Sequence, residues 1–392
     1  MSQKDWQVYK FGGTSMKNAD ALEQVGNLVT NSDAENLIVV VSAMGGMTDA
    51  LLQFSETQDS KLIEDIQSLY IETSDSLVKN VSSRLSLIEA FKEDIQEIRE
   101  IAKLKDHASL SIEENEILGF GEIWTSKLLH AYLSAMGEIE TSWLNPMDFL
   151  IIQNEDMGAN VNWSKSKEAF TQAIKDKSGK VIMGGFIASD IEGKSTNLGR
   201  NGSDYSASIL GSLSEAQSVT IWTDVDGVLT GDPRVVNQAR MIEQMTYDEA
   251  IELSYFGAEV IHPKTMAPLM HKEIPLYIRN TFNPESLGTS INSQQKNTRA
   301  VKGISTIKDI ALLNLEGTGM IGVPGIVNRL GKVLQQANIS IVLISQASSE
   351  HSICFAVRSK DARSAADVIK QEFKDDFKNE NLSAIQIEED CS

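Results

Sequence analysis

The sequence predicts an α/β protein, with a mainly parallel β-sheet flanked by helices and then a smaller α+β domain. Apolar runs at 37–41, 180–183 and 219–222 have almost no polar alternation, which is typical of strands buried on both faces. Patterns with helical spacing separate these runs, for example at 117–136 and 206–213. Strands that alternate with helices favour a parallel sheet.

The first domain is expected to span residues 1–290, and it contains a charged helical subdomain at 60–105. One apolar stripe is expected to bury that subdomain: Leu85, Ile88, Phe91, Ile95, Ile98 and Ile101. Thr246 and Glu249 have the spacing of a capping box, so a helix should begin there. Residues 283–298 are rich in Asn, Gln, Ser, Pro and Gly, and we interpret them as a linker.

The second domain is expected to span residues 299–392. Its pattern is β-α-β-β-α-β, which is the ferredoxin-like split arrangement. The elements are expected at 310–315, 326–337, 339–345, 352–357, 362–377 and 384–387.

Composition limits the classes of function. A chain of 392 residues usually forms two or three domains, and 41% hydrophobic with 23% charged residues is ordinary for a globular protein. The net charge of −20 argues against nucleic acid or an anionic membrane as a partner. Cys354 and Cys391 are the two cysteines, too few for a disulfide framework or a thiolate zinc site.

The N-terminal sequence lacks the apolar segment of a signal peptide, and no run approaches membrane-spanning length, so a cytoplasmic location is expected. The five histidines are scattered without metal-ligand spacing. We interpret them as surface or packing residues and assign no side chain as a direct metal ligand.

The segment Lys10-Phe11-Gly12-Gly13-Thr14-Ser15 joins an apolar strand to a helical pattern. Free N–H groups and partial positive charge at a helix N-terminus favour an anion, and glycine allows close approach of the backbone. Lys10 adds a full charge. A phosphate site and a simple tight turn are the two interpretations of this segment taken alone.

Three further loops combine glycine with polar side chains. They are Ser42 to Asp49, Leu198 to Asp204, and Trp222 to Val228 with the nearby Arg234. Each has a plain alternative, such as a capped helix start or an Asp-Gly turn. We expect all four loops at the carboxyl ends of strands in one sheet, where open α/β proteins bind ligands, and together they favour phosphoryl transfer.

Two other glycine patterns are discounted. Gly193-Lys194-Ser195 resembles the end of a Walker motif but has Ala188 where the motif needs glycine. The glycines at 317, 319 and 322 match a dinucleotide fingerprint, yet no acidic residue ends the next strand and a hairpin follows it.

Taken together, the loops at 10–15, 199–204, 223–227 and 256–263 resemble aspartate kinases of the amino acid kinase family. The segment after residue 300 looks like the regulatory ACT region of those enzymes. The sequence of the chain is most similar to the N-terminal aspartokinase part of bifunctional aspartokinase–homoserine dehydrogenases. The resemblance spans the chain and keeps the order of the motifs.

The resemblance implies MgATP-dependent phosphorylation of the side-chain carboxylate of L-aspartate, the first step toward lysine, threonine and methionine. Lys10, Gly12 and Gly13 would meet the transferring phosphate, and Asp204 would orient Lys10. The implied aspartate-binding residues are Ser42, Thr48, Glu122, Phe186, Arg200 and Ser203, with Glu122 near the amino group and Arg200 on a carboxylate. The implied ATP-binding residues also include Thr223, Asp224, Val228, Arg234, Glu259 and Val260.

This chain departs from the family in two places. Many relatives carry Lys where Glu259 stands, so a backbone contact to the nucleotide is expected there instead of a side-chain contact. Bifunctional relatives continue past residue 392 into a second ACT unit and a dehydrogenase domain. The regulatory region is therefore expected to be incomplete, with no dehydrogenase activity and impaired feedback inhibition.

The implied chemistry needs no general base, because a carboxylate is already ionised at neutral pH and can attack the γ-phosphorus directly. Gln346 is the candidate contact for an amino acid effector, with threonine favoured over lysine, and an exposed turn residue is the alternative. Self-association through the ACT region is also implied. The competing functions are a kinase of glutamate or acetylglutamate, and an inactive effector-binding protein.

Overall fold

The computed structural model describes residues 5–104, 112–155, 158–255, 261–293 and 301–391, and it divides into two compact units, Met1–Ser305 and Thr306–Ser392. The predicted α/β class with a C-terminal α+β domain is confirmed. No helix within these ranges is long and apolar enough to cross a membrane.

The first unit is built on a sheet whose eight described strands run in the order β10-β12-β11-β9-β1-β2-β6-β3. The pairs from β11 through β9, β1, β2 and β6 to β3 are parallel, whereas β12 is antiparallel to β11. The strands are β1 (Trp6–Phe11), β2 (Asn36–Val41), β3 (Thr141–Trp143), β6 (Lys180–Gly184), β9 (Ser218–Thr223), β10 (Gln244–Met245), β11 (Leu276–Asn280) and β12 (Thr289–Ile291).

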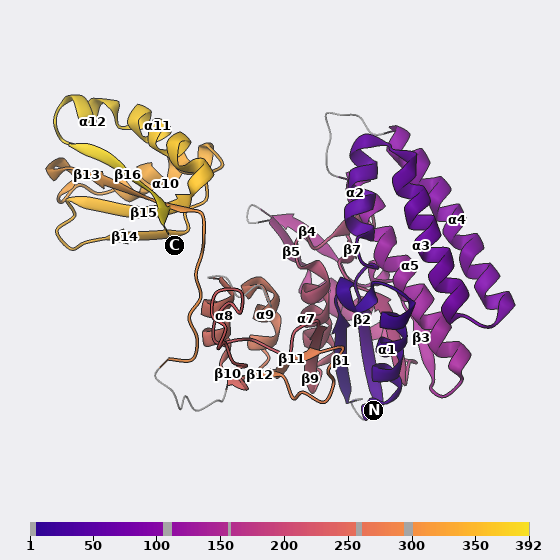
Figure 1. Ribbon diagram of the computed structural model, residues 1–392. Coiled ribbons are helices and arrows are strands. Elements are labelled where there is room, and N and C mark those ends of the chain that lie inside the picture. The colour runs from indigo at the N-terminus through magenta and orange to yellow at the C-terminus, as the bar shows by residue number, and fades with distance from the viewer. Residues whose placement is uncertain (1–4, 105–111, 156–157, 256–260, 294–300, 392) are drawn as a thin grey trace. The chain divides into compact units, whose positions relative to one another are not determined.

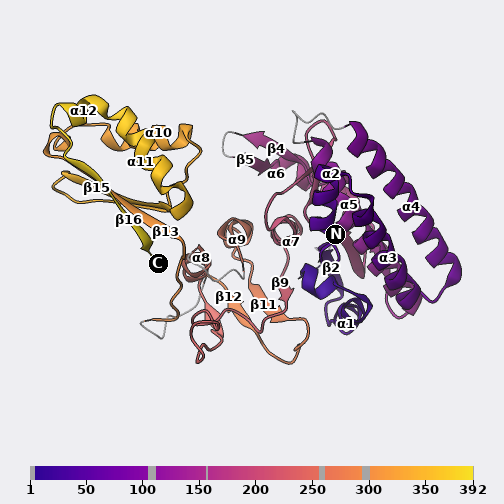
Figure 2. The same ribbon diagram turned by 45° about the horizontal axis from the view of Figure 1, so that its top comes forward.

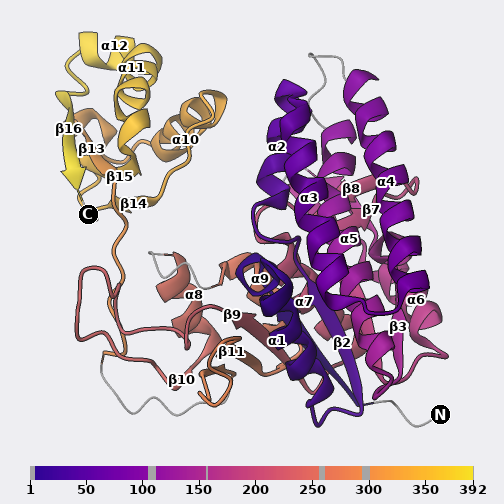
Figure 3. The same ribbon diagram turned by 45° about the vertical axis from the view of Figure 1, so that its right-hand side comes forward.

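Helices cover both faces of this sheet, because the central strands are apolar on both sides. The first set is α1 (Ala19–Thr30), α2 (Met47–Thr57), α3 (Ser60–Leu77), α4 (Val81–Leu104) and α5 (Ile112–Met136). The second set is α6 (Trp163–Ile174), α7 (Gly202–Ser214), α8 (Tyr247–Tyr255) and α9 (Pro263–Met270). Val8 and Ile38 pack in one core with helices α6 to α9. Phe11 and Val39 pack in a separate core with helices α1 to α5. Figure 3 shows α2 to α5 running alongside one another, and α7 and α9 are neighbours in Figure 2.

Smaller elements complete the unit (Figure 1). They are the 3₁₀ turns η1 (Gly13–Met16) and η2 (Pro146–Asp148), the hairpin of β4 (Ile152–Glu155) with β5 (Gly158–Val161), and the hairpin of β7 (Ile187–Ser189) with β8 (Ser195–Asn197). The capping box is confirmed, because the Thr246 N–H donates to Glu249 Oε2 over 2.8 Å and the Glu249 N–H donates to Thr246 Oγ1 over 3.2 Å.

Three details differ from the sequence-based expectation. The expected linker contains β12, because the buried Thr289 hydroxyl accepts the Val228 N–H and donates to Ile242 O, which holds this polar segment in the sheet. Leu85 is 58% exposed, since burial of α4 begins at Phe91, which stacks on Tyr70. The loop at 198–204 follows β8, which belongs to a separate hairpin and not to the large sheet.

The second unit has a four-stranded antiparallel sheet in the order β14-β15-β13-β16, with its helices packed into one core. Its elements are β13 (Ile310–Glu316), η3 (Thr318–Met320), α10 (Ile326–Gln336), β14 (Leu343–Gln346), β15 (Ser352–Arg358), η4 (Ser359–Asp361), α11 (Ala362–Glu372), α12 (Lys374–Lys378) and β16 (Ala384–Cys391). The ferredoxin-like arrangement is therefore confirmed. The predicted helix at 362–377 is interrupted at the fully buried Phe373, and β14 begins four residues later than expected.

The glycines at 317 and 319 have a packing role. A Cβ at Gly317 would lie 2.2 Å from Asn381 O, and one at Gly319 would lie 2.5 Å from Asn381 Cβ. This contact with the segment before β16 explains the pattern without a dinucleotide.

Candidate active site

The carboxyl ends of four adjacent strands are aligned at one edge of the sheet, because backbone hydrogen bonds between neighbouring strands continue one residue past the strand ends. Gly12 N–H donates to Trp222 O, Ser42 N–H to Phe11 O, and Gly185 N–H to Val41 O. The loops after β9, β1, β2 and β6 therefore start from one edge of the sheet. In open α/β sheets this edge is where ligands bind.

A cavity of about 620 Å³ opens at this edge. It is lined by side chains and backbone from β1, the loop 42–49, α5, the loop after β6, and the start of α7. Nine of the predicted site residues line it together: Lys10, Gly13, Ser42, Thr48, Glu122, Phe186, Arg200, Ser203 and Asp204. The structure thus brings together all six residues that were assigned to aspartate and the two that were assigned to catalysis.

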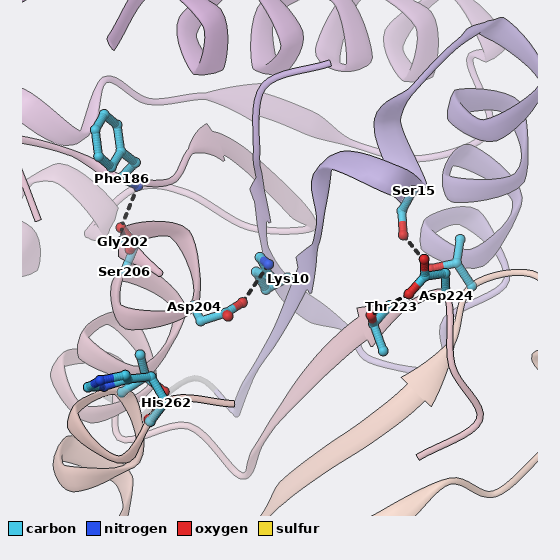
Figure 4. Close-up of polar contacts among 11 residues, drawn as sticks. Lys10, Ser15, Phe186, Gly202, Asp204, Ser206, Thr223, Asp224 and His262 are labelled. Carbon is cyan, nitrogen blue, oxygen red and sulfur yellow. Dashed lines mark hydrogen bonds and ion pairs between the residues drawn. The ribbon is translucent and has the colours of Figure 1, made fainter. Parts of the chain in front are cut away.

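Lys10 and Asp204 form an ion pair at the floor of the cavity. Lys10 is 8% exposed near the end of β1, and its Nζ lies 2.5 Å from Asp204 Oδ1 in the first turn of α7. Figure 4 shows the two side chains pointing toward each other. The carboxylate holds the ammonium in one place beside the cavity. An ammonium has three donors, so Lys10 can also meet a ligand there.

Two helices of eleven and thirteen residues, α2 and α7, begin at the cavity. Their N-cap residues, Gly46 and Asn201, both have left-handed backbone conformations, and neither provides a side-chain cap in the described part of the chain. The Met47 N–H of α2 donates to Met44 O. The other N–H groups in the first turn of each helix lack an intrahelical acceptor, and both helix dipoles favour negative charge there. Together with Lys10 and Arg200, they make the cavity suitable for an anion.

Glu122 is the buried acidic side chain of the cavity. It is 4% exposed on α5, and its Oε2 has no hydrogen-bond partner among the described residues. Burial raises the pKa of Glu122 to about 8, although the Ala43 N–H and the nearby Lys10 lower it. A buried carboxylate with a free oxygen is suited to accept an ammonium group from a ligand. The cavity can therefore bind a molecule that carries both anionic groups and a cation.

Close backbone contacts fix the wall formed by the loop after β6. A Cβ at Gly185 would lie 2.7 Å from Ser203 Cα, and one at Gly202 would lie 2.6 Å from the Phe186 ring. Phe186 has a φ of 67°, a left-handed conformation that costs a non-glycine residue on the order of 1 kcal/mol or more. Strain of this kind is commonly found at binding sites.

The residues predicted to bind ATP are more dispersed. Gly12 follows β1, and on the neighbouring strand Thr223 is the last residue of β9. The Thr223 hydroxyl donates to Oδ1 of the next residue, Asp224, over 3.2 Å (Figure 4). Arg234 is exposed and forms a bidentate pair with Asp232. None of these residues lines the 620 Å³ cavity.

Val228 lies in the hydrophobic core, and its N–H and C=O already bond to Thr289 and Ile242. The structure therefore does not bring Val228 into the cavity. Glu259 and Val260 lie outside the described residues.

Sequence reasoning assigned no role to several residues that also line the cavity: Met44, Asp49, Leu118, Asn197 and Asn201. Asp49 could have been found because it follows Thr48 in the same loop. Asn201 also carries a signal in the sequence. Its backbone is left-handed, with a φ of 56°, and Asn tolerates this conformation better than most other residues. Leu118 carries no such signal, since an apolar residue of a helix is ordinarily part of the core.

The fold and the site define an α/β protein with a charged cavity at the carboxyl ends of parallel strands. Residues 5–280 match the model of the amino acid kinase family, and residues 313–373 match an ACT domain. The chain belongs to the amino acid kinase family.

Among curated relatives, the chain is 35% identical to bifunctional aspartokinase/homoserine dehydrogenase 2 of Arabidopsis thaliana, over 99% of this chain and 44% of the relative. It is also 35% identical to the bifunctional enzyme of Haemophilus influenzae, over 98% of this chain and 48% of the relative. The chain thus spans less than half the length of these two relatives. Among solved structures, aspartokinase III of E. coli in complex with aspartate and ADP has a TM-score of 0.79 at 27% identity, covering 98% of this chain and 86% of the other.

Proposed function

We propose that this protein is an aspartate kinase that transfers the γ-phosphoryl group of MgATP to the side-chain carboxylate of L-aspartate, giving 4-phospho-L-aspartate and ADP. The observation that carries the proposal is the single cavity in which Glu122, Arg200 and the Lys10–Asp204 pair meet two uncapped helix N-termini. Supporting it, relatives along the whole chain are named aspartokinases, and one similar structure contains aspartate and ADP.

The charges of the cavity match those of aspartate. Glu122 is proposed to accept the ammonium group, and the Arg200 guanidinium to hold the carboxylate that does not react, through two parallel hydrogen bonds. Ser42, Thr48 and Ser203 supply hydroxyls around the same ligand, and Phe186 forms the adjoining wall. The reacting carboxylate then points toward Lys10 near the end of β1.

The transfer step needs alignment and charge neutralisation more than proton transfer. The side-chain carboxylate of aspartate is ionised at neutral pH, so it attacks the γ-phosphorus without a base, and the phosphorus–oxygen bond to ADP breaks. Lys10 stabilises negative charge on the transferring group, together with the N–H groups of Gly12 and Gly13. Asp204 holds Lys10 in place through the ion pair.

The nucleotide is proposed to extend from Lys10 over the adjoining strand β9, with Thr223, Asp224, Val228, Arg234, Glu259 and Val260 as its predicted contacts. Of these residues, Thr223 and Asp224 lie beside Gly12 at the aligned strand ends. Within the described residues no group of three His, Cys, Asp or Glu side chains could hold a metal ion, so Mg²⁺ would be held mainly by phosphate oxygens. When bound there, Mg²⁺ neutralises phosphate charge.

The C-terminal unit is proposed to bind an amino acid effector, with threonine favoured. Gln346, the predicted contact, is exposed at the end of β14, which forms an edge of the four-stranded sheet. We further propose residues 1–290 as the catalytic domain, residues 299–392 as an ACT regulatory region through which copies associate, and a place for the reaction at the start of lysine, threonine and methionine synthesis.

The proposal is tested by ADP release with L-aspartate, L-glutamate and N-acetyl-L-glutamate as acceptors, with and without threonine. We expect ADP release that depends on aspartate. Acetylglutamate lacks the ammonium that Glu122 would bind, and glutamate is longer by one methylene group. Release that depends on glutamate or acetylglutamate alone contradicts the assignment, and threonine binding without turnover of any acid favours an inactive effector-binding protein.

The raised pKa of Glu122 predicts a pH dependence. Only the ionised carboxylate attracts an ammonium, so the KM for aspartate should fall by up to about tenfold per pH unit as the pH rises toward about 8, and then level off. Folding stability of the ligand-free protein should change in the opposite direction and decrease as the pH rises. The unfolded chain loses this proton near 4.5 but the folded chain only near 8, so the contribution of Glu122 to folding stability falls between those pH values.

The pH dependence is checked by aspartate KM and by thermal unfolding between pH 6 and 9, for wild type and Glu122→Gln. Asp94→Asn is the matched control, because burial also raises the pKa of Asp94, which bonds to Trp124 Nε1 away from the cavity. We expect Glu122→Gln, and not Asp94→Asn, to flatten the KM profile. An unchanged profile in Glu122→Gln would refute the assigned role.

A further inference from the structure

Two buried hydroxyls outside the assigned machinery make the same pair of hydrogen bonds, each to its own helix and to a loop that lines the cavity. Thr125 on α5 donates to Gly121 O over 2.8 Å, and its Oγ1 accepts the Met44 N–H over 3.0 Å. Ser206 on α7 donates to Gly202 O over 3.0 Å, and its Oγ accepts the Phe186 N–H over 2.9 Å. The second pair is drawn in Figure 4.

The first bond of each pair is common in helices, since Ser and Thr often donate to the carbonyl four residues earlier. Ser74 on α3 and Ser214 on α7 make that bond, to Tyr70 O and Leu210 O. The second bond is what separates Thr125 and Ser206 from them. In both cases the lone pair left on the hydroxyl holds the backbone N–H of a loop that lines the cavity.

Each held loop already lies against the helix that holds it. A Cβ at Gly121 would lie 2.9 Å from Ala43 Cβ, beside the Met44 bond, and Gly202 contacts the Phe186 ring in the same way. The bond between the Met44 N–H and Thr125 is buried, and the bond between the Phe186 N–H and Ser206 is partly buried. Without the hydroxyl each N–H would be left unpaired, which is costly, so the loop would move to find another partner.

The positions of these loops determine the shape of the cavity. The first loop carries Ser42 and leads through Gly46 into the N-terminus of α2, and the second carries Phe186 in its strained left-handed conformation. A shift of either loop would move groups that face the ligand while leaving Lys10 on β1 in place.

We propose that Thr125 and Ser206 are positioning residues for the aspartate pocket, each acting through one backbone N–H, and this rests on the proposed aspartate kinase function. Neither side chain lines the cavity, so their effect is indirect. It should appear in aspartate binding more than in the transfer step.

The test uses the full chain with Thr125→Val, which keeps the shape, and Ser206→Ala. We expect each to raise the KM and the Kd for aspartate on the order of tenfold, with kcat and the KM for ATP changed by less than about threefold. Thr125→Ser and Ser206→Thr keep the hydroxyl and should restore aspartate binding. Ser74→Ala and Ser214→Ala are the controls, since they remove the helix bond alone.

Aspartate-dependent ADP release, aspartate binding by calorimetry and thermal unfolding are measured on every variant. If Thr125→Val and Ser206→Ala lower the Tm as the controls do but leave aspartate KM and Kd unchanged, the positioning role is overturned. Wild-type protein that binds aspartate without releasing ADP overturns the proposed function alone, and the positioning role is then judged from Kd. Wild-type protein that neither binds nor phosphorylates aspartate overturns both.

Discussion

Replacing Lys10 with alanine is expected to lower kcat on the order of a hundredfold or more, which corresponds to about 2.7 kcal/mol of transition-state stabilisation. The KM for aspartate should change little. The reason is that the Lys10 ammonium, held by Asp204 near the end of β1, acts on charge that is greatest while the phosphoryl group is between donor and acceptor. Steady-state kinetics with varied aspartate and varied ATP separate the two parameters.

A second buried lysine provides the control for Lys10→Ala. Lys180, at the other end of β6 from the cavity, is 5% exposed and donates to the carbonyls of Ser32 and Ala34. Lys180→Met therefore removes a buried ammonium on the same sheet without touching the site, and it should alter thermal stability but not kcat. Activity of Lys10→Ala within a few-fold of wild type would show that the role assigned to Lys10 is wrong.

Replacing Arg200 with alanine is expected to raise the KM for aspartate on the order of a hundredfold, with a smaller change in kcat. A bidentate pair between guanidinium and carboxylate is present in both the ground state and the transition state, so its loss weakens binding at both stages. Arg200→Lys should recover only part of the affinity, because an ammonium cannot make two parallel hydrogen bonds.

A substrate analogue tests which group of aspartate Arg200 holds. The α-amide of aspartate lacks the carboxylate that Arg200 is proposed to hold, so wild-type enzyme should discriminate strongly against it, whereas Arg200→Ala should treat it nearly as it treats aspartate. Arg84→Ala on α4 serves as the control, since Arg84 pairs with Asp75 and bonds to Val78 O outside the cavity. Equal discrimination by wild type and Arg200→Ala would mean that Arg200 holds another group.

Much of the fold could be predicted because its sequence signals are local. The central strands are continuously apolar, and the capping box at Thr246 marks the start of α8. β12 could not be predicted, since its segment is polar and is held in the sheet by the buried Thr289 hydroxyl with partners more than forty residues away. The predicted burial of Leu85 is wrong, because periodicity shows which face of a helix is apolar but not where its packing partners begin.

In the candidate site, too, residues with local sequence signals could be predicted, and residues that act through distant contacts could not. Glycine loops with polar and charged residues indicated the segments that carry Lys10, Arg200 and Asp204. Glu122 and Phe186 lie outside those loops and were expected only from the resemblance to aspartate kinases. The helix hydroxyls of Thr125 and Ser206 have no such signal, because a Ser or Thr within a helix looks the same whether or not it also holds a distant loop. The burial of Val228, the last residue of the motif at 222–228, has no signal in the sequence either.

The most direct test of the central claim is detection of the product itself. Protein, MgATP and L-aspartate are incubated with hydroxylamine, which converts an acyl phosphate to a stable hydroxamate, and the hydroxamate is identified by mass spectrometry. The account predicts aspartyl 4-hydroxamate in an amount equal to the ADP released, and almost none with Lys10→Ala. ADP released without hydroxamate, or hydroxamate at the α-carboxyl group, would contradict it.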